Sequence, residues 1–150
     1  MTKLCSLPDC LNKQIEEDVY IRWLRRKAAA HVKRDRKRCA WEITGETYRR
    51  QIHAAVIRSN GCDHYTGEQL RWDLVSSYSN AESKAGRSVY KATLALLPTA
   101  DHVPGADGKF DFVICSWRTN DAKNDLGHDD FISLCRRVVE FHDSRTAFAP

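Results

Sequence analysis

An acid and a histidine stand side by side at Asp101 and His102, and side-chain amides follow at Asn120 and Asn124. Carboxylate and amide oxygens are the ligands that Mg²⁺ prefers in proteins. A neutral histidine can take a proton from water near pH 7. The types and order of these residues therefore predict metal-assisted hydrolysis, with Asp101 and Asn120 or Asn124 as ligands and His102 as the general base.

A hairpin followed by a helix would position these side chains. The strands are predicted at 99–104 and 110–115, joined by the turn-forming segment 104–108, which reads PGADG. Neighbours on a strand point to opposite faces, so Asp101 and His102 are expected to face apart unless a bulge re-aims one of them. A helix starting near Thr119 would place Asn120 and Asn124 on one face, because they are four residues apart.

Taken together, these residues resemble the HNH endonuclease motif, the ββα-metal or His-Me finger, in its Asp-His…Asn variant. Asp111 and Asn120 are nine residues apart, as the middle and third positions of that family typically are, and the helix reads Asn-x-x-Lys from Asn120 to Lys123. The segment Cys62-x-x-Tyr65-Thr66-Gly67 also resembles the family's lead-in. The resemblance covers about residues 60–126 and is strongest over 98–125.

The resemblance implies a metal-dependent DNA endonuclease with one divalent ion, Mg²⁺ first and Mn²⁺ as the alternative. Asp101 and Asn120 would be ligands, His102 the general base, and Asp111 the group that orients His102. Asn124 would be an alternative ligand or a supporting group, and Lys123 and Arg118 would contact phosphate.

The sequence departs from the family at Asp111, where asparagine is usual. An ionised aspartate accepts hydrogen bonds but cannot donate one to a carbonyl. This departure keeps a second interpretation open, in which the chain is a non-catalytic DNA-binding or regulatory protein built on a degenerate finger.

Positive charge is concentrated in residues 21–50, which hold eleven Lys or Arg against three Asp or Glu, while the other 120 residues hold thirteen against seventeen. A local basic block is typical of nucleic-acid binding, although a solvated helix face has the same composition. We expect duplex DNA as the partner, held by salt-sensitive phosphate contacts. The expected contact residues are Lys33, Arg34, Arg36 and Lys37.

Apolar periodicity predicts helices over 15–37 and 44–59, a short strand over 70–74, a helix over 89–97 and a final amphipathic helix over 129–141 with Cys135 in the core. Thr44 is the expected cap of the second helix. We therefore predict an α+β fold, with a basic helical region at 1–59 that contacts DNA and an HNH-like ββα-metal domain at 60–150. Asp63-His64 is expected to be structural or incidental, because no hairpin and asparagine follow it.

The composition of the chain bears on its compartment and on zinc. No apolar run reaches the roughly eighteen residues that span a bilayer, and the N-terminus lacks a signal-peptide core, so a cytoplasmic protein without membrane contact is expected. Cys62 and Cys115 alone cannot complete a four-coordinate zinc site, so structural zinc is not expected. A zinc-dependent structural or RNA-binding module would require Cys5 and Cys10 to join them. The recognition sequence, nicking against double-strand cleavage, and a homodimeric state are left open.

Overall fold

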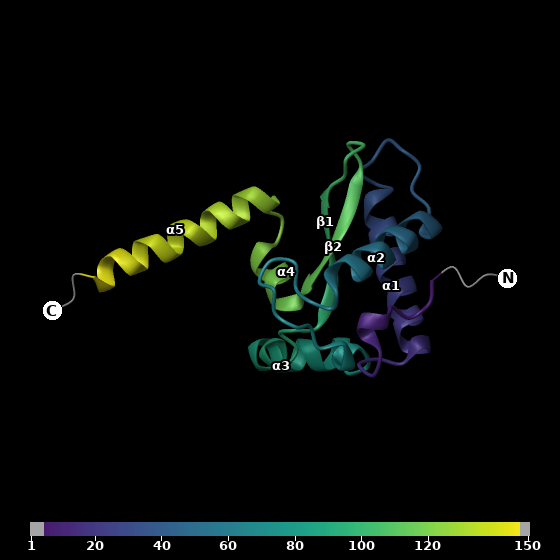
Figure 1. Cartoon of the computed structure of the whole chain (residues 1–150), viewed down its shortest axis with the longest axis horizontal. Helices are drawn as coiled ribbons and strands as arrows, with labels where there is room; N and C mark the ends of the chain where they lie inside the picture. Colours follow the sequence, from purple (N-terminus) through teal and green to yellow (C-terminus); the bar gives the residue numbers. More distant parts are fainter. Residues whose placement is uncertain (1–4, 148–150) are drawn as a thin grey trace. The chain divides into compact units, whose positions relative to one another are not determined.

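The structure, a computed structural model, describes residues 5–147. Within this range it contains five α-helices and one two-stranded antiparallel sheet (Figure 1), so the predicted α+β class is confirmed. The chain divides into two compact units, one ending at Asn120 and the other beginning at Asp121. Each unit is described separately below.

Two long helices begin the first unit, α1 (Glu17–Asp35) and α2 (Gly45–Ser59). Both confirm the predicted helices to within two residues at each end. The hydroxyl of Thr44 caps α2 by accepting a hydrogen bond from the Thr47 backbone N–H at 3.1 Å. Asn60 ends α2 in the left-handed conformation, with a φ of 48°.

The predicted hairpin is formed by β1 (Pro98–Pro104) and β2 (Phe110–Ser116). The register is continuous and free of bulges, with Asp101 opposite Val113 and His102 opposite Phe112. In the turn, the Gly105 N–H donates to the Lys109 carbonyl at 2.7 Å. Neighbouring residues therefore alternate between the two faces of the hairpin throughout.

Helix α4 (Trp117–Lys123) follows β2 without a gap and begins two residues before the predicted start. Its first two N–H groups, from Trp117 and Arg118, donate to the carbonyls of Leu97 at 2.8 Å and Ala95 at 3.1 Å. These bonds hold the start of the helix beside the segment that enters β1. Asn120 is therefore carried on an element fixed to the hairpin.

One hydrophobic core joins α1 and α2 to the hairpin. Trp23 and Trp72 meet edge to face, with ring centroids 5.1 Å apart. Phe112 packs edge to face on Tyr48 at 5.0 Å, which fixes α2 against β2. The core is completed by buried side chains from the same elements and includes Tyr20, Leu24, Ala28, Ile52, Val56, Leu70 and Ile114.

Two predicted elements between α2 and β1 were wrong. The segment at 70–74 is not a strand: an isolated bridge between Cys62 and Gln69 precedes it, and a 3₁₀ helix runs over Trp72–Ser76. Leu70 and Trp72 are buried as predicted, but alternating burial here comes from a tight turn rather than from an extended strand.

Helix α3 (Asn80–Thr93) begins nine residues before the helix predicted over 89–97, in a polar stretch whose sequence fits either a loop or a frayed helix start, and it ends before residue 97. The hydroxyl of Ser79 caps it by accepting from the Glu82 N–H at 3.4 Å, and Arg87 kinks it with a φ of 44°. No residue of α3 is buried.

In the second unit, α5 (His128–Thr146) confirms a final helix, but none of its side chains is buried. Cys135 is exposed, so its predicted place in a core was wrong. The apolar stripe itself is present, and Leu134, Val138, Val139 and Phe141 are 44–56% exposed. Among the described helices, none combines the length and apolar character needed to cross a membrane.

The carboxylate of Asp63 ties the lead-in turn to the junction of β2 and α4. One oxygen accepts from the N–H groups of Tyr65 at 2.7 Å and Thr66 at 3.2 Å. The other accepts from the Ser116 N–H at 2.7 Å and the Thr119 hydroxyl at 2.9 Å. Burial raises the pKa of this carboxyl, but the hydrogen bonds outweigh burial and the pKa lies below its usual value. Asp63 is therefore structural, as expected.

Replacing Asp63 by asparagine should lower the free energy of unfolding by about 2–4 kcal/mol, because the amide nitrogen would face hydrogen-bond donors in a buried site. Chemical denaturation measures the change. The matched control is Asp107→Asn in the exposed hairpin turn, where the amide oxygen can keep the single bond from the Lys109 N–H. Equal stability of the two variants would contradict this role.

Candidate functional site

His102 is held by a carboxylate that the sequence did not single out. Its Nε2 lies 2.7 Å from Oδ2 of Asp35, the last residue of α1. The same oxygen accepts a hydrogen bond from the Tyr48 hydroxyl of α2 at 3.0 Å. The Asp35 side chain is 2% exposed and the His102 side chain 19%. Helices α1 and α2 and strand β1 therefore meet at one buried carboxylate.

Arg34 lies against the other nitrogen of His102. Its Nη2 is 2.6 Å from Nδ1 of His102 and 2.6 Å from Nδ1 of His31. A guanidinium can only donate hydrogen bonds, so both Nδ1 atoms accept. We infer that His102 is the neutral tautomer with its hydrogen on Nε2, which donates to Asp35. The only lone pair available to a proton is on Nδ1, beneath Arg34.

Burial favours the neutral ring of His102. Burial lowers the pKa of His102, and Arg34 lowers it further, while Asp35 opposes both. The net shift is downward, so His102 is unprotonated at neutral pH. Burial, followed by the neighbouring His102 and Arg34, lowers the pKa of His31 to about 3.

Asp35 is ionised at neutral pH. Burial is the largest influence and raises its pKa, but His102, the Tyr48 hydroxyl and Arg34 together outweigh burial and bring the pKa below its usual value. A neutral imidazole beside an ionised carboxylate can accept a proton, because the carboxylate stabilises the imidazolium that forms. The arrangement is therefore that of a general base.

Asp101 lies on the opposite face of the hairpin from His102, as the strand alternation predicts. Its Oδ2 accepts a hydrogen bond from the Tyr65 hydroxyl at 2.7 Å, and its side chain is buried. Burial and this contact raise the pKa of Tyr65 above its usual value, so the phenol keeps its proton. Asn120 is half-buried on α4. A carboxylate and an amide oxygen fit a hard divalent cation in kind.

The resemblance implied that Asp111 orients His102, but the structure places Asp111 elsewhere. It stands opposite Val103 in the register, and its carboxylate pairs with Arg58 of α2 at 3.2 Å. The same arginine donates to the Phe112 carbonyl at 2.9 Å. Strand alternation turns Asp111 away from the face that carries Phe112 and His102. Asp35 makes the contact that was predicted for Asp111.

The predicted residues after Asn120 also differ from expectation. Helix α4 ends at Lys123, and Asn124 follows it with a φ of 50°, so Asn120 and Asn124 do not share a helix face. Lys123 is 5% exposed, which is unfavourable for a phosphate contact. Arg118 is exposed and paired with Glu68.

The predicted DNA-contacting residues Lys33, Arg34, Arg36 and Lys37 are all exposed at the C-terminal end of α1. Of these, Arg34 alone contacts His102. Arg36 is anchored by a hydrogen bond from its Nε to the Ile43 carbonyl at 2.8 Å. The basic block and the base thus share one end of one helix, and DNA contact by these residues stays a prediction.

His31, Asp35 and His102 form the one metal-ligand cluster found among residues 5–147, with ligand atoms within 4.8 Å of one another. Two imidazoles and a carboxylate suit a transition metal better than Mg²⁺. Arg34 lies against both Nδ1 atoms, so an ion could reach them only after the guanidinium moved. The cluster contains no cysteine, and the six cysteines are free thiols.

The contribution of α1 could have been detected in part. His31 and Asp35 are four residues apart in a predicted helix, which places them on one face. That spacing signalled a paired histidine and carboxylate within the basic block. Nothing local connected them with His102, which lies 67 residues after Asp35.

No family model, curated protein or solved structure matches this chain. Any role for the cluster of Asp35, His102 and Arg34 is therefore argued from its geometry and from the resemblance in the hairpin.

The depressed pKa of His31 should make the protein less stable in mild acid. The pKa of His31 is 6.5 in its ordinary state and about 3 in the folded protein. Between these two pH values, the unfolded chain binds a proton that the folded chain does not. Stability is therefore lost as pH falls through this window, by up to about 1.4 kcal/mol per pH unit for one proton.

Denaturation between pH 4.5 and 6.5 measures this slope. In His31→Gln the free energy of unfolding should depend less steeply on pH, by up to the contribution of one proton. This holds whatever the stability of the variant at pH 7. The exposed His142→Gln is the control and should keep the wild-type slope. An unchanged slope in His31→Gln would contradict a buried neutral His31.

Proposed function

We propose that the chain is a metal-dependent DNA endonuclease of the HNH type that hydrolyses phosphodiester bonds. The observation that carries the proposal is the contact between His102 and Asp35. His102 lies on the first strand of a ββα arrangement, and Asp35 lies at the basic end of α1. A neutral histidine backed by a buried carboxylate is suited to remove a proton from water. Duplex DNA is the proposed substrate, and we propose that the protein acts in the cytoplasm.

In the proposed reaction, Nδ1 of His102 takes the proton of the attacking water. Arg34 must first leave Nδ1, and an incoming phosphate gives its guanidinium a stronger, charge-assisted partner. Asp35 then stabilises the imidazolium through Nε2. Substrate binding and exposure of the base are therefore coupled in this mechanism.

Asp101 and Asn120 are the proposed ligands of the divalent ion, Mg²⁺ or Mn²⁺. The ion would supply positive charge that offsets the negative charge developing on the phosphate and on the leaving oxygen. Because Asp101 and His102 face opposite sides of β1, the scissile phosphate must approach along the edge of β1 that does not pair with β2.

The alternative is a non-catalytic DNA-binding or regulatory protein. Two observations favour it: Arg34 covers the base nitrogen of His102, and Asp111 is engaged by Arg58. In this case the same basic residues would bind DNA and His102 would only anchor the end of α1 to β1.

A plasmid-nicking assay with Mg²⁺ or Mn²⁺ separates the two functions. His102→Ala should lower the rate by about 100-fold or more, the usual contribution of a general base, while the exposed His142→Ala should leave it unchanged. Wild-type activity in His102→Ala would refute the mechanism. Absence of nicking by the wild type would favour the non-catalytic alternative.

Asp35→Asn and Asp111→Asn form a matched pair, because each replaces a carboxylate by an amide. Asp35→Asn should slow nicking about 10-fold or more, since Asp35 stabilises the imidazolium, whereas Asp111→Asn should have little effect. A larger effect at Asp111 would restore the role that the family resemblance gave to it.

The pH dependence of nicking should report His102 directly. The rate should rise with pH as His102 loses its proton, with the midpoint of the rise below pH 6.5 because the pKa of His102 is lowered. Arg34→Gln should move this rise to higher pH, since Arg34 lowers the pKa, and Asp35→Asn should move it to lower pH. Shifts in the same direction, or no shift in either variant, would contradict the assignment.

A further inference from the structure

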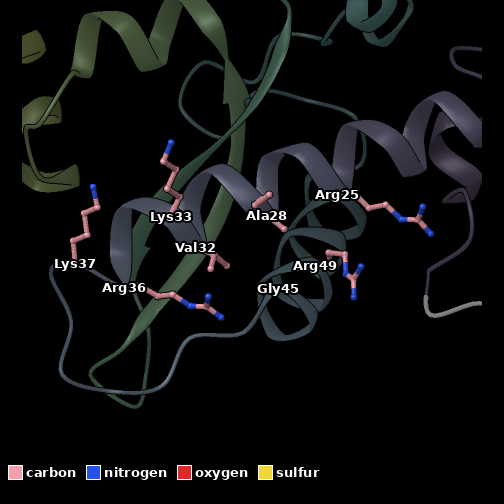
Figure 2. A pocket seen from close by; sticks show the side chains of 9 residues that line it. Arg25, Ala28, Val32, Lys33, Arg36, Lys37, Gly45 and Arg49 are labelled. Atoms are coloured by element: carbon pink, nitrogen blue, oxygen red, sulfur yellow. The ribbon is translucent and has the colours of Figure 1, made fainter.

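A basic pocket of about 630 Å³ lies between α1 and α2, apart from the contacts of His102. Its floor is apolar and is formed by Ala28, Ala29 and Val32. The residues that line it include five cationic ones and no acidic one: Arg25, Lys33, Arg36, Lys37 and Arg49. Figure 2 shows Arg36 and Arg49 on the side of α1 nearer to Gly45, with Lys33 and Lys37 extending to the other side.

The five cations lack counter-charges. Within residues 5–147 none of them takes part in an ion pair. The acids of the same two helices are engaged elsewhere: Asp35 with His102, Glu46 with Arg50 at 2.9 Å, and Asp18 with Arg22 at 2.6 Å. Like charges gathered around a hollow repel one another, and an anion in the hollow removes that repulsion.

Arg49 gives the more specific indication. Its Nε is buried and has no hydrogen-bond partner among the described residues. A buried N–H without an acceptor costs about 1–3 kcal/mol. Arg49 also lines the pocket, so an anion there would give its guanidinium acceptor oxygens, and an arginine fork matches the oxygens of a phosphate in geometry.

The start of α2 adds backbone donors to the same pocket. Gly45 is the first residue of α2 and lines the pocket. The Thr44 hydroxyl caps the Thr47 N–H, so it leaves the earlier N–H groups of the first turn to other acceptors. The N-terminal end of a helix is also the positive end of its dipole. No atom lies within 4 Å of the position that a Cβ on Gly45 would take, so space is available there.

We propose that this pocket binds a phosphate group through Arg25, Arg36, Arg49 and the start of α2, and that the phosphate belongs to the backbone of bound DNA. The apolar floor suits the sugar that accompanies a backbone phosphate. Arg49 and Gly45 were not among the residues predicted to contact DNA. The choice of DNA as the carrier rests on the proposed function, whereas the phosphate site itself does not.

Two pairs of variants test the site, and in each pair the test variant and its control lose the same single positive charge. Arg49→Gln and Arg25→Gln remove pocket cations, and their neighbours Arg50→Gln and Arg26→Gln, which do not line the pocket, are the controls. Gly45→Asp is a third variant that adds a negative charge in the open space. An acid in the first turn favours a helix, so the fold should tolerate this change.

The first measurement is the melting temperature of the full chain with inorganic phosphate, compared with potassium chloride at equal ionic strength. Phosphate should stabilise the wild type and both controls, and this stabilisation should be lost in Arg49→Gln and Gly45→Asp. Equal stabilisation of all variants, or none in the wild type, would overturn the site.

The second measurement is binding of a labelled duplex over a salt series, without divalent ions so that cleavage cannot interfere. Arg49→Gln should bind about 5-fold more weakly than Arg50→Gln, with a salt slope lower by about 0.9, the value for one lost phosphate contact. Equal DNA binding in the two variants, together with lost stabilisation by phosphate, would assign the pocket to free phosphate and overturn the DNA claim. Because neither measurement uses nicking, failure of the proposed nuclease activity would leave these results intact.

Discussion

The buried carboxylate of Asp35 is the constraint on which the candidate site depends. A charged group is costly to remove from water unless hydrogen bonds and opposite charge compensate it. Asp35 obtains that compensation from Tyr48 of α2, His102 of β1 and the adjoining Arg34. Because these partners lie on separate elements, the end of α1 is stable only where α2 and β1 also meet.

Helix α1 has a buried face that contacts His102 and an exposed face that is basic. Its buried face ends in His31 and Asp35, which define the surroundings of His102. Lys33 on its exposed face, and Arg36 and Lys37 just after its end, keep their charges in water. Arg34 lies between the two faces and connects them, since it touches both histidines and is 43% exposed. An anion that attracts the exposed face can thus change what covers the base.

The elements with strong local signals were predicted from the sequence. The capped helix at Thr44, the amphipathic stripe of α1 and the turn at residues 104–108 depend on neighbours in the chain, and the structure confirms all three. The segment around Trp72 was wrong because alternating burial fits a 3₁₀ turn as well as a strand. Helix α3 was missed in part because its stability does not come from a buried stripe.

Only the part of the candidate site that lies within one continuous stretch of sequence was predicted. Asp101, His102 and Asn120 were found through their spacing within one hairpin and helix. The contacts of Asp35 and Arg34 with His102 were not, because they cross 67 and 68 residues of sequence, and Tyr48 reaches His102 only through Asp35. Asp111 was assigned to His102 from a family pattern, and the structure pairs it with Arg58 instead.

The central claim is that His102 is a neutral base whose Nε2–H is held by Asp35. Nitrogen-15 NMR of the histidine side chains tests it most directly, with the His102 signals assigned by their loss in His102→Ala. The account predicts a neutral ring at pH 7 with its hydrogen on Nε2 and a pKa below 6.5. A ring that is charged at pH 7, or that carries its hydrogen on Nδ1, would contradict it.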